Sequence, residues 1–178
     1  MVALFLAEGF EISEAMTPLD YMRRAGIEVS TVSVSGDKYV KSSCGVSVQA
    51  DMPISELDPA GLEAVVLPGG MPGATNLAKS AAVNCAVDTA LRNCALVAAI
   101  CASPAVVLAS RGLLSGKKAT CHTSFKDKID NYTSAGTVYD PPFLTGMAAG
   151  QAGEFGLEIV RILKGDEAVR RICRGLCL

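Results

Sequence analysis

The sequence has no tryptophan, few other aromatic residues, a single histidine and no run of basic residues. Basic patches and aromatic platforms are the features by which proteins bind nucleic acids, so their absence argues against such a partner. The formal net charge of −2 and a pI near 5.4 point the same way. We therefore expect no nucleic acid among the binding partners.

The sequence also has little that predicts a metal site or a membrane anchor. Its seven cysteines form no Cys-x-x-Cys pair and the only histidine is His122, so a zinc site is poorly supported. No secretory signal pattern is present at the N-terminus. The longest uncharged stretch, residues 93–110, contains Pro104 and is better explained as strand, turn and helix than as a membrane span. We expect no metal, no cofactor, no membrane partner, and reduced thiols in a cytoplasmic protein.

Half of the residues are hydrophobic and the mean hydropathy is +0.36, which is enough for a generous core in one domain over residues 1–178. Apolar and β-branched runs predict buried strands at residues 2–6, 27–34, 64–67 and 95–100. Helical patterns alternate with them at residues 13–24, 81–92, 102–109 and 153–164. This alternation predicts an α/β fold with a doubly wound, mostly parallel sheet and helices on both faces. In such a sheet a site forms at the carboxyl ends of the central strands.

Two boundaries are specific predictions. Ser13 is expected to be the N-cap of the first helix, and Gly26 is expected to end it. Residues 118–121 are expected to form a further strand that ends at His122.

The most informative stretch is residues 95–109, with Cys101 where the apolar strand turns into a helix. Small neighbours allow a tight turn, as in a nucleophile elbow, where the reactive atom points out from the strand end. The N-terminus of the following helix would favour thiolate over thiol, so we expect a lowered pKa for Cys101. The alternative interpretation of this stretch alone is an inert core cysteine.

Two other elements fall at strand ends in this arrangement. Pro68-Gly69-Gly70 follows a buried strand and is either an ordinary turn or a source of backbone N–H groups for an oxyanion. No Gly-Lys-Ser/Thr follows, so it is not a phosphate loop. Glu14, near the first helix, is by itself no more than a carboxylate favoured by the helix dipole.

Five segments together resemble a known family: LAEGFEISE at residues 6–14, DYMRRAG at 20–26, VVLPGG at 65–70, AAICASP at 98–104 and KDK at 126–128. They are similar to the ThiJ/PfpI superfamily, and within it to the branch of the parkinsonism-associated deglycase and the bacterial YajL-type proteins. The resemblance spans nearly the whole chain. It implies a flavodoxin-like homodimer in which Cys101 is a nucleophilic, oxidisable thiol and Glu14 lies beside its sulfur.

Two adjacent acids cannot both ionise easily, so one of this pair should hold a proton. A protonated Glu14 that donates to the Cys101 sulfur would favour the thiolate and later act as acid or base.

The resemblance extends to four more positions of the site. His122 matches a histidine near the cysteine, either as a second proton carrier or as a partner of a loop. Gly69, Gly70 and Ala102 match positions whose N–H groups face a bound oxygen or an oxidised sulfur. Glu11 matches an acid of the dimer interface.

The chain departs from the family pattern at three places. Ala102 stands where the protease branch has histidine, which argues against peptidase activity. Cys44 follows Ser43 where the close branch often has arginine, and Met147 lies in a segment that often carries another arginine. Loss of these cations should weaken the binding of anionic ligands and change the dimer contacts.

Three hypotheses for function follow. The first is a cofactor-independent enzyme for small reactive carbonyls, of glyoxalase or deglycase type, whose partners are small carbonyl compounds or glycated amines. The second is an oxidative-stress sensor or redox-regulated chaperone that acts through oxidation of Cys101. The third is an interaction module with an inert cysteine.

Overall fold

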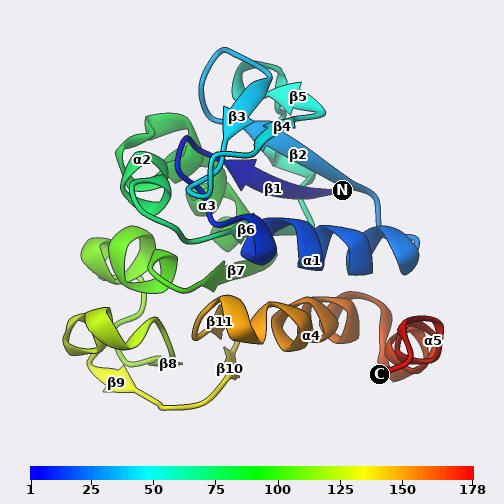
Figure 1. Cartoon of the computed structure of the whole chain (residues 1–178). Coiled ribbons are helices and arrows are strands. Elements are labelled where there is room, and N and C mark those ends of the chain that lie inside the picture. Colours follow the sequence, from blue (N-terminus) through cyan, green and yellow to red (C-terminus); the bar gives the residue numbers. More distant parts are fainter.

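A computed structural model covers residues 1–178, and its centre is a seven-stranded sheet in the order β10-β11-β7-β6-β1-β2-β5 (Figure 1). The strands of this sheet are β1 (Val2–Leu6), β2 (Val29–Ser33), β5 (Met52–Pro53), β6 (Ala64–Leu67), β7 (Leu96–Ile100), β10 (Thr137–Asp140) and β11 (Phe143–Gly146). All pairs are parallel except the hairpin of β10 and β11. The predicted doubly wound, mostly parallel α/β sheet is confirmed.

Two small strand pairs lie outside this sheet. The hairpin of β3 (Tyr39–Lys41) and β4 (Ser47–Gln49) is antiparallel, and β8 (Lys118–Ala119) pairs in parallel with β9 (Asn131–Tyr132).

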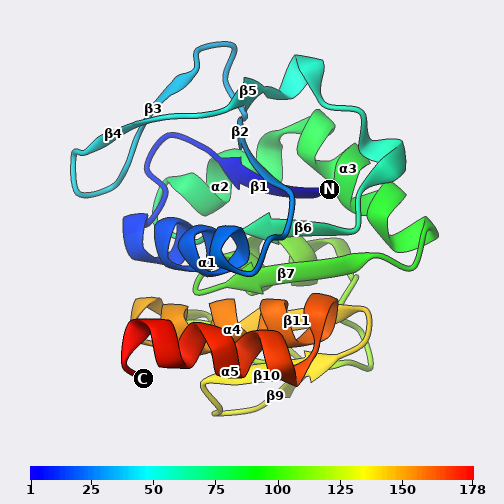
Figure 2. The same ribbon diagram turned by 90° about the vertical axis from the view of Figure 1, so that its right-hand side faces the viewer.

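The helices cover both faces of the sheet (Figures 1 and 2). They are α1 (Ile12–Arg24), α2 (Gly73–Lys79), α3 (Ala81–Arg92), α4 (Ala152–Lys164) and α5 (Asp166–Leu176), with short helical turns η1 (Ile54–Glu56), η2 (Pro59–Gly61), η3 (Pro104–Leu108), η4 (Ala109–Arg111), η5 (Thr123–Lys128) and η6 (Ala149–Gln151). None of the helices combines the length and the apolar character needed to cross a membrane.

The core consists of two apolar clusters, one on each side of the sheet. Along β1, Leu4 and Leu6 belong to the cluster under α1, α4 and α5, whereas Ala3 and Phe5 belong to the cluster under α2 and α3. Strands β6 and β7 alternate in the same way. Because successive side chains of a strand point to opposite faces, a strand buried on both faces must be apolar throughout, as these runs are.

Chain order reverses between β1 and β6. After β1 the chain winds outward through β2 and β5, and it then returns to the other side of β1 as β6 and β7. Ligands of open α/β sheets bind at such a switch point, beyond the carboxyl ends of the strands. The segments that follow β1, β6 and β7 therefore meet at one edge of the sheet.

Three details of the sequence prediction are wrong. The N-cap of α1 is Glu11, whose carboxylate accepts from the Glu14 N–H at 2.7 Å, while Ser13 lies inside the helix. Strand β8 belongs to its own two-stranded sheet, so His122 does not end a strand of the central sheet. The helix predicted after Cys101 is present, but as a short π-helical turn, η3, followed by the 3-10 turn η4, and not as a regular α-helix. The end of α1 at Gly26, with φ of +71°, is as expected.

Helices α1 and α4 cross closely at a glycine. A Cβ at the buried Gly156 would lie 3.0 Å from the Cα of Pro18 and 3.0 Å from the ring of Tyr21. One turn earlier, a Cβ at Gly153 would meet only the Tyr21 ring, at 3.5 Å or more. The crossing therefore depends on the missing side chain at Gly156.

This difference gives a paired stability prediction. Alanine favours a helix over glycine by up to about 1 kcal/mol, so Gly153→Ala should leave stability unchanged or raise it. Gly156→Ala should lose that gain to the contact with the Pro18 backbone and come out at least about 1 kcal/mol less stable than Gly153→Ala. Urea denaturation of both variants measures the difference, and equal free energies of unfolding would show that the crossing tolerates a methyl group.

Candidate functional site

Cys101 lies in a strained turn directly after β7. Its φ is +65°, a left-handed conformation that non-glycine residues rarely adopt. Two backbone hydrogen bonds hold this turn: the Cys101 N–H donates to Gly146 O at 2.9 Å, and the His122 N–H donates to Cys101 O at 2.8 Å. The turn has the backbone of a nucleophile elbow and leaves the cysteine half-buried.

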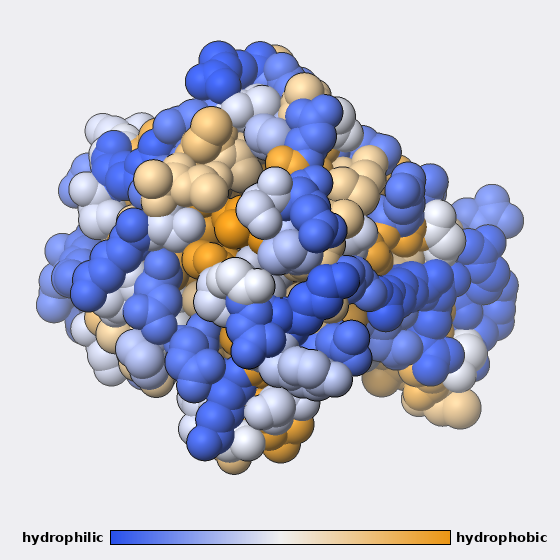
Figure 3. All heavy atoms as spheres, turned by 90° about the horizontal axis from the view of Figure 1, so that it is seen from above, coloured by the Kyte–Doolittle hydropathy of each residue, from blue (hydrophilic) through white to orange (hydrophobic).

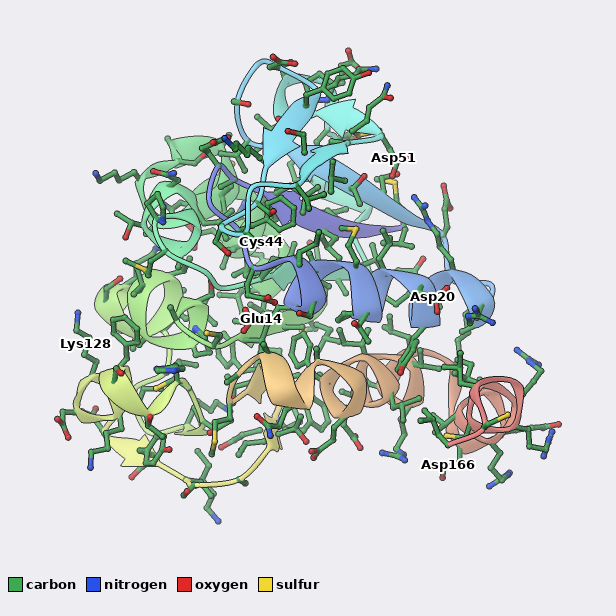
Figure 4. All side chains as sticks on the ribbon, in the orientation of Figure 1. Glu14, Asp20, Cys44, Asp51, Lys128 and Asp166 are labelled. Atoms are coloured by element: carbon green, nitrogen blue, oxygen red, sulfur yellow. The ribbon has the colours of Figure 1, made fainter.

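Glu14 is the only carboxyl among the buried residues, and it has no exposed surface. It lies in the first turn of α1, near the loop that carries Cys44 (Figure 4). Its Oε2 accepts from the Gly69 N–H at 2.9 Å. A Cβ built on Gly69 would touch both this oxygen, at 2.7 Å, and the Cβ of Cys101, at 2.6 Å, so the carboxyl and the thiol lie on the two sides of one small space. The structure thus brings Glu14 and Cys101 together, as the family resemblance implied.

Gly69 leaves the room that this contact needs. A Cβ at Gly69 would lie 2.6 Å from the Cβ of Cys101, 2.7 Å from Oε2 of Glu14 and 3.0 Å from the Ala102 nitrogen. Any side chain there would push the acid and the thiol apart. The Pro-Gly-Gly segment is therefore more than an ordinary turn.

The three predicted N–H donors have different partners. The backbones of Gly70 and Ala102 lower the pKa of the Cys101 thiol, which is the effect expected of N–H donors that face the sulfur or an oxyanion. The N–H of Gly69 is bonded to Glu14 instead, so this donor positions the acid and does not face the reacting atom.

Burial controls the acidity of the pair. Burial first raises the pKa of Glu14 to about 7, against hydrogen bonds from Cys101 and Gly69 that lower it. Burial, then the charge and hydrogen bond of Glu14, raise the pKa of the Cys101 thiol to about 12, while Gly70 and Ala102 act in the opposite direction. The prediction of a lowered thiol pKa is therefore wrong for the pair with an ionised Glu14. Glu14 therefore loses its proton first, near neutral pH, and Cys101 forms a thiolate there only by passing its own proton to the Glu14 carboxylate.

The backbone of His122 is hydrogen-bonded to Cys101, whereas its side chain contacts the residues that follow it in the chain. Its Nδ1 accepts from the Ser124 N–H at 3.3 Å and so caps η5, and its ring meets Phe125 edge-on at 6.4 Å between centroids. Of the two interpretations of His122, this geometry matches the loop partner.

The two departures that remove a cation, at Cys44 and Met147, both lie near the site. Cys44 is exposed on a loop that is joined to the start of α1, because the Ser43 N–H donates to Phe10 O at 2.8 Å. A hydrogen bond from Ser42 lowers the pKa of the Cys44 thiol. Met147 directly follows Gly146, whose carbonyl accepts the hydrogen bond from the Cys101 N–H. Neither supplies a cation.

One contact of the site was not anticipated from the sequence. The Ser103 hydroxyl donates to Pro68 O at 2.6 Å, and both residues are buried. Ser103 stands where an N-cap serine is common, so its local pattern predicts a bond to its own helix.

The largest groove, about 490 Å³, lies at the other end of the strands, beside Leu96, Tyr139 and Ile162. Cys101, at the opposite end of β7, does not line this groove.

A buried acid beside a cysteine, at the switch point of a doubly wound sheet, is typical of α/β proteins that carry a cysteine at the strand-to-helix elbow. The sequence of residues 1–162 matches the model of the DJ-1/PfpI family, and the chain belongs to that family. The fold is accordingly the flavodoxin-like α/β fold that the resemblance implied.

Similar proteins cover nearly the whole chain. Protein dj-1beta of Drosophila melanogaster is 34% identical over 177 residues, which is 97% of this chain and 94% of the relative. The glutathione-independent glyoxalase DJR-1.2 of Caenorhabditis elegans is 30% identical over 175 residues, covering 96% of this chain and 92% of its own length. The oxidised DJ-1 of Toxoplasma gondii superposes with a TM-score of 0.96 at 36% identity, covering 99% of this chain and 97% of its own.

The raised pKa of Glu14 predicts a specific pH dependence of stability. The folded state binds the Glu14 proton more tightly than the unfolded state. The contribution of this proton to the free energy of unfolding is therefore fully present below about pH 4.5 and is lost as the pH rises through about 7. The loss amounts to roughly 3 kcal/mol. Glu14→Gln cannot ionise at this position, so its free energy of unfolding should not show this loss between pH 4.5 and 8. Urea unfolding of both proteins between pH 4.5 and 8 measures this, with the exposed Glu56→Gln as control. Parallel curves for wild type and Glu14→Gln would contradict the assignment.

Proposed function

We propose that this protein is a cofactor-independent enzyme that acts on small reactive carbonyls, converting methylglyoxal to lactate or removing early glycation adducts from amines. The observation that carries the proposal is the fully buried Glu14 carboxyl, which the Gly69 N–H holds at 2.9 Å beside Cys101. A related family member of similar length is named a glutathione-independent glyoxalase, which supports the same chemistry.

The first step of the proposed mechanism is the attack of the Cys101 thiolate on the aldehyde carbon, which forms a hemithioacetal. The developing oxyanion accepts hydrogen bonds from the N–H groups of Gly70 and Ala102, and Glu14 gives it the shared proton. The pKa of Glu14, about 7, suits a group that must both give and take a proton near neutral pH.

The second step moves hydrogen within the substrate. The Glu14 carboxylate takes the proton from the former aldehyde carbon and returns it to the neighbouring carbon, so that one carbon is oxidised and the other reduced. The product is a thioester of lactate on Cys101. Water then cleaves the thioester, which releases lactate and restores the thiol.

His122 has no step in this proposal because its Nδ1 is occupied by the Ser124 N–H. Peptidase activity is not part of it either, since Ala102 occupies the position of the protease histidine. The absence of the two arginines favours uncharged carbonyls over anionic ones, because Cys44 and Met147 offer no ion pair to a carboxylate.

A homodimer and a cytoplasmic location complete the proposal. All seven cysteines are free thiols, as a reducing compartment requires. The face that carries the β3–β4 hairpin exposes Val46 and Tyr39, and apolar patches on it alternate with polar residues (Figure 3). A mixed surface of this kind suits a dimer interface.

The activity predicts a clear mutational pattern. Cys101→Ser and Glu14→Gln should each lower lactate formation from methylglyoxal by about 10³-fold or more, since one loses the nucleophile and the other the proton carrier. Cys94→Ser, which removes an exposed thiol elsewhere, should keep full activity. The assay contains no glutathione and no added metal. Turnover that survives in either site variant would exclude this mechanism.

The second candidate function is an oxidative-stress sensor or redox-regulated chaperone. The sulfur of Cys101 is already surrounded by two N–H groups and by Glu14, which would also hold the oxygens of a sulfinate. The solved Toxoplasma relative is described as oxidised.

Peroxide titration distinguishes the sensor from a protein with merely exposed thiols. Cys101 should gain two oxygens before the other six cysteines, although Cys44, Cys85, Cys94 and Cys177 are more exposed. Site-resolved mass spectrometry follows each thiol. Oxidation in the order of exposure would count against this function.

A further inference from the structure

The hydroxyl of Ser103 makes a contact that its position does not require. Ser103 precedes η3 and has no exposed surface, yet its side chain makes no capping bond to its own helix. It reaches across 35 residues of sequence and donates to Pro68 O at 2.6 Å. The bond joins the segment after β7 to the segment after β6.

The acceptor belongs to the peptide unit that holds the acid. The carbonyl of Pro68 and the N–H of Gly69 are two ends of one planar amide. Its oxygen accepts from Ser103, and its N–H donates to Oε2 of Glu14 at 2.9 Å. A hydrogen bond at the oxygen polarises the amide and strengthens its N–H as a donor. It also fixes the plane in which that N–H points.

The surrounding packing makes this orientation matter. The Gly69 Cα lies so close to Cys101 and Glu14 that an added Cβ would fall within 2.7 Å of both side chains. A tilt of the Pro68–Gly69 amide would therefore shift the Glu14 carboxyl relative to the sulfur. The second carboxyl oxygen, Oε1, is buried and has no hydrogen-bond partner, so the Gly69 N–H is the one hydrogen bond that holds the carboxyl in place.

We propose that Ser103 is a positioning residue for the proton carrier: through the Pro68–Gly69 amide, its hydroxyl fixes the Glu14 carboxyl against Cys101. The role of Ser103 in turnover rests on the function proposed above, whereas its effect on Glu14 does not. Ser103 touches neither the substrate nor the sulfur in this scheme, and acts only through the amide.

The test compares Ser103→Ala with two matched variants. Ser103→Thr keeps the hydroxyl. Ser110→Ala removes a hydroxyl that donates to Val106 O at 2.8 Å in the same chain segment, with no link to the site. The first readout is the titration midpoint of the Glu14 carboxyl carbon by ¹³C NMR, identified by its absence from Glu14→Gln. The second is lactate formation from methylglyoxal.

Loss of the hydroxyl weakens the N–H bond that favours the ionised carboxylate, so the Glu14 midpoint of Ser103→Ala should move upward by roughly half a pH unit or more. Its kcat should fall about tenfold or more, with KM changed less than about twofold, because a misplaced proton carrier slows chemistry and not binding. Ser103→Thr and Ser110→Ala should retain the wild-type midpoint.

A midpoint of Ser103→Ala within about 0.2 unit of wild type would overturn the proposal, whatever happens to the melting temperature, since a purely structural bond changes stability alone. An equal shift in Ser110→Ala would overturn it as well. If wild type makes no lactate, the proposed function fails, and the Glu14 midpoint still decides the role of Ser103.

Discussion

The proton that Glu14 and Cys101 share is the constraint around which the site is built. Two acids buried side by side cannot both ionise at neutral pH, and the pKa values of both groups are raised. The pair becomes useful because N–H groups stabilise its single negative charge from two sides: Gly69 on the carboxylate, and Gly70 with Ala102 on the sulfur. The balance between these donors decides which atom holds the proton, and so whether the cysteine is a nucleophile or a resting thiol.

The sheet makes this balance possible by gathering three separate segments. Strand order places β1, β6 and β7 side by side, so the residues after them meet at one edge. The register of fully buried strands is strongly specified, because a slip by one residue would exchange the two apolar clusters. The packing of the core therefore fixes the positions of Glu14, Gly69 and Cys101 relative to one another. The same core explains why the chemistry needs glycine at Gly69, where no side chain fits.

The sequence predicts the fold well because its strands are short apolar runs and its helices carry clear stops, such as Gly26. It also predicts which residues meet at the site, although for Glu14 only the family resemblance distinguished it from an exposed carboxylate. Three features were beyond local patterns. The cap at Glu11 uses a residue that is uncommon at N-caps, the pairing of β8 with β9 depends on distant residues, and the raised pKa of Cys101 depends on burial and on a neighbour 87 positions away in sequence. The bond from Ser103 to Pro68 is likewise a product of tertiary packing.

The left-handed backbone of Cys101 has a consequence for the evolution of this chain. A non-glycine residue in that conformation costs on the order of 1–2 kcal/mol, which glycine would not incur. At this single position, selection for a more stable fold and selection for a reactive sulfur act in opposite directions. Drift toward stability would replace the thiol first and leave a well-folded, inert protein.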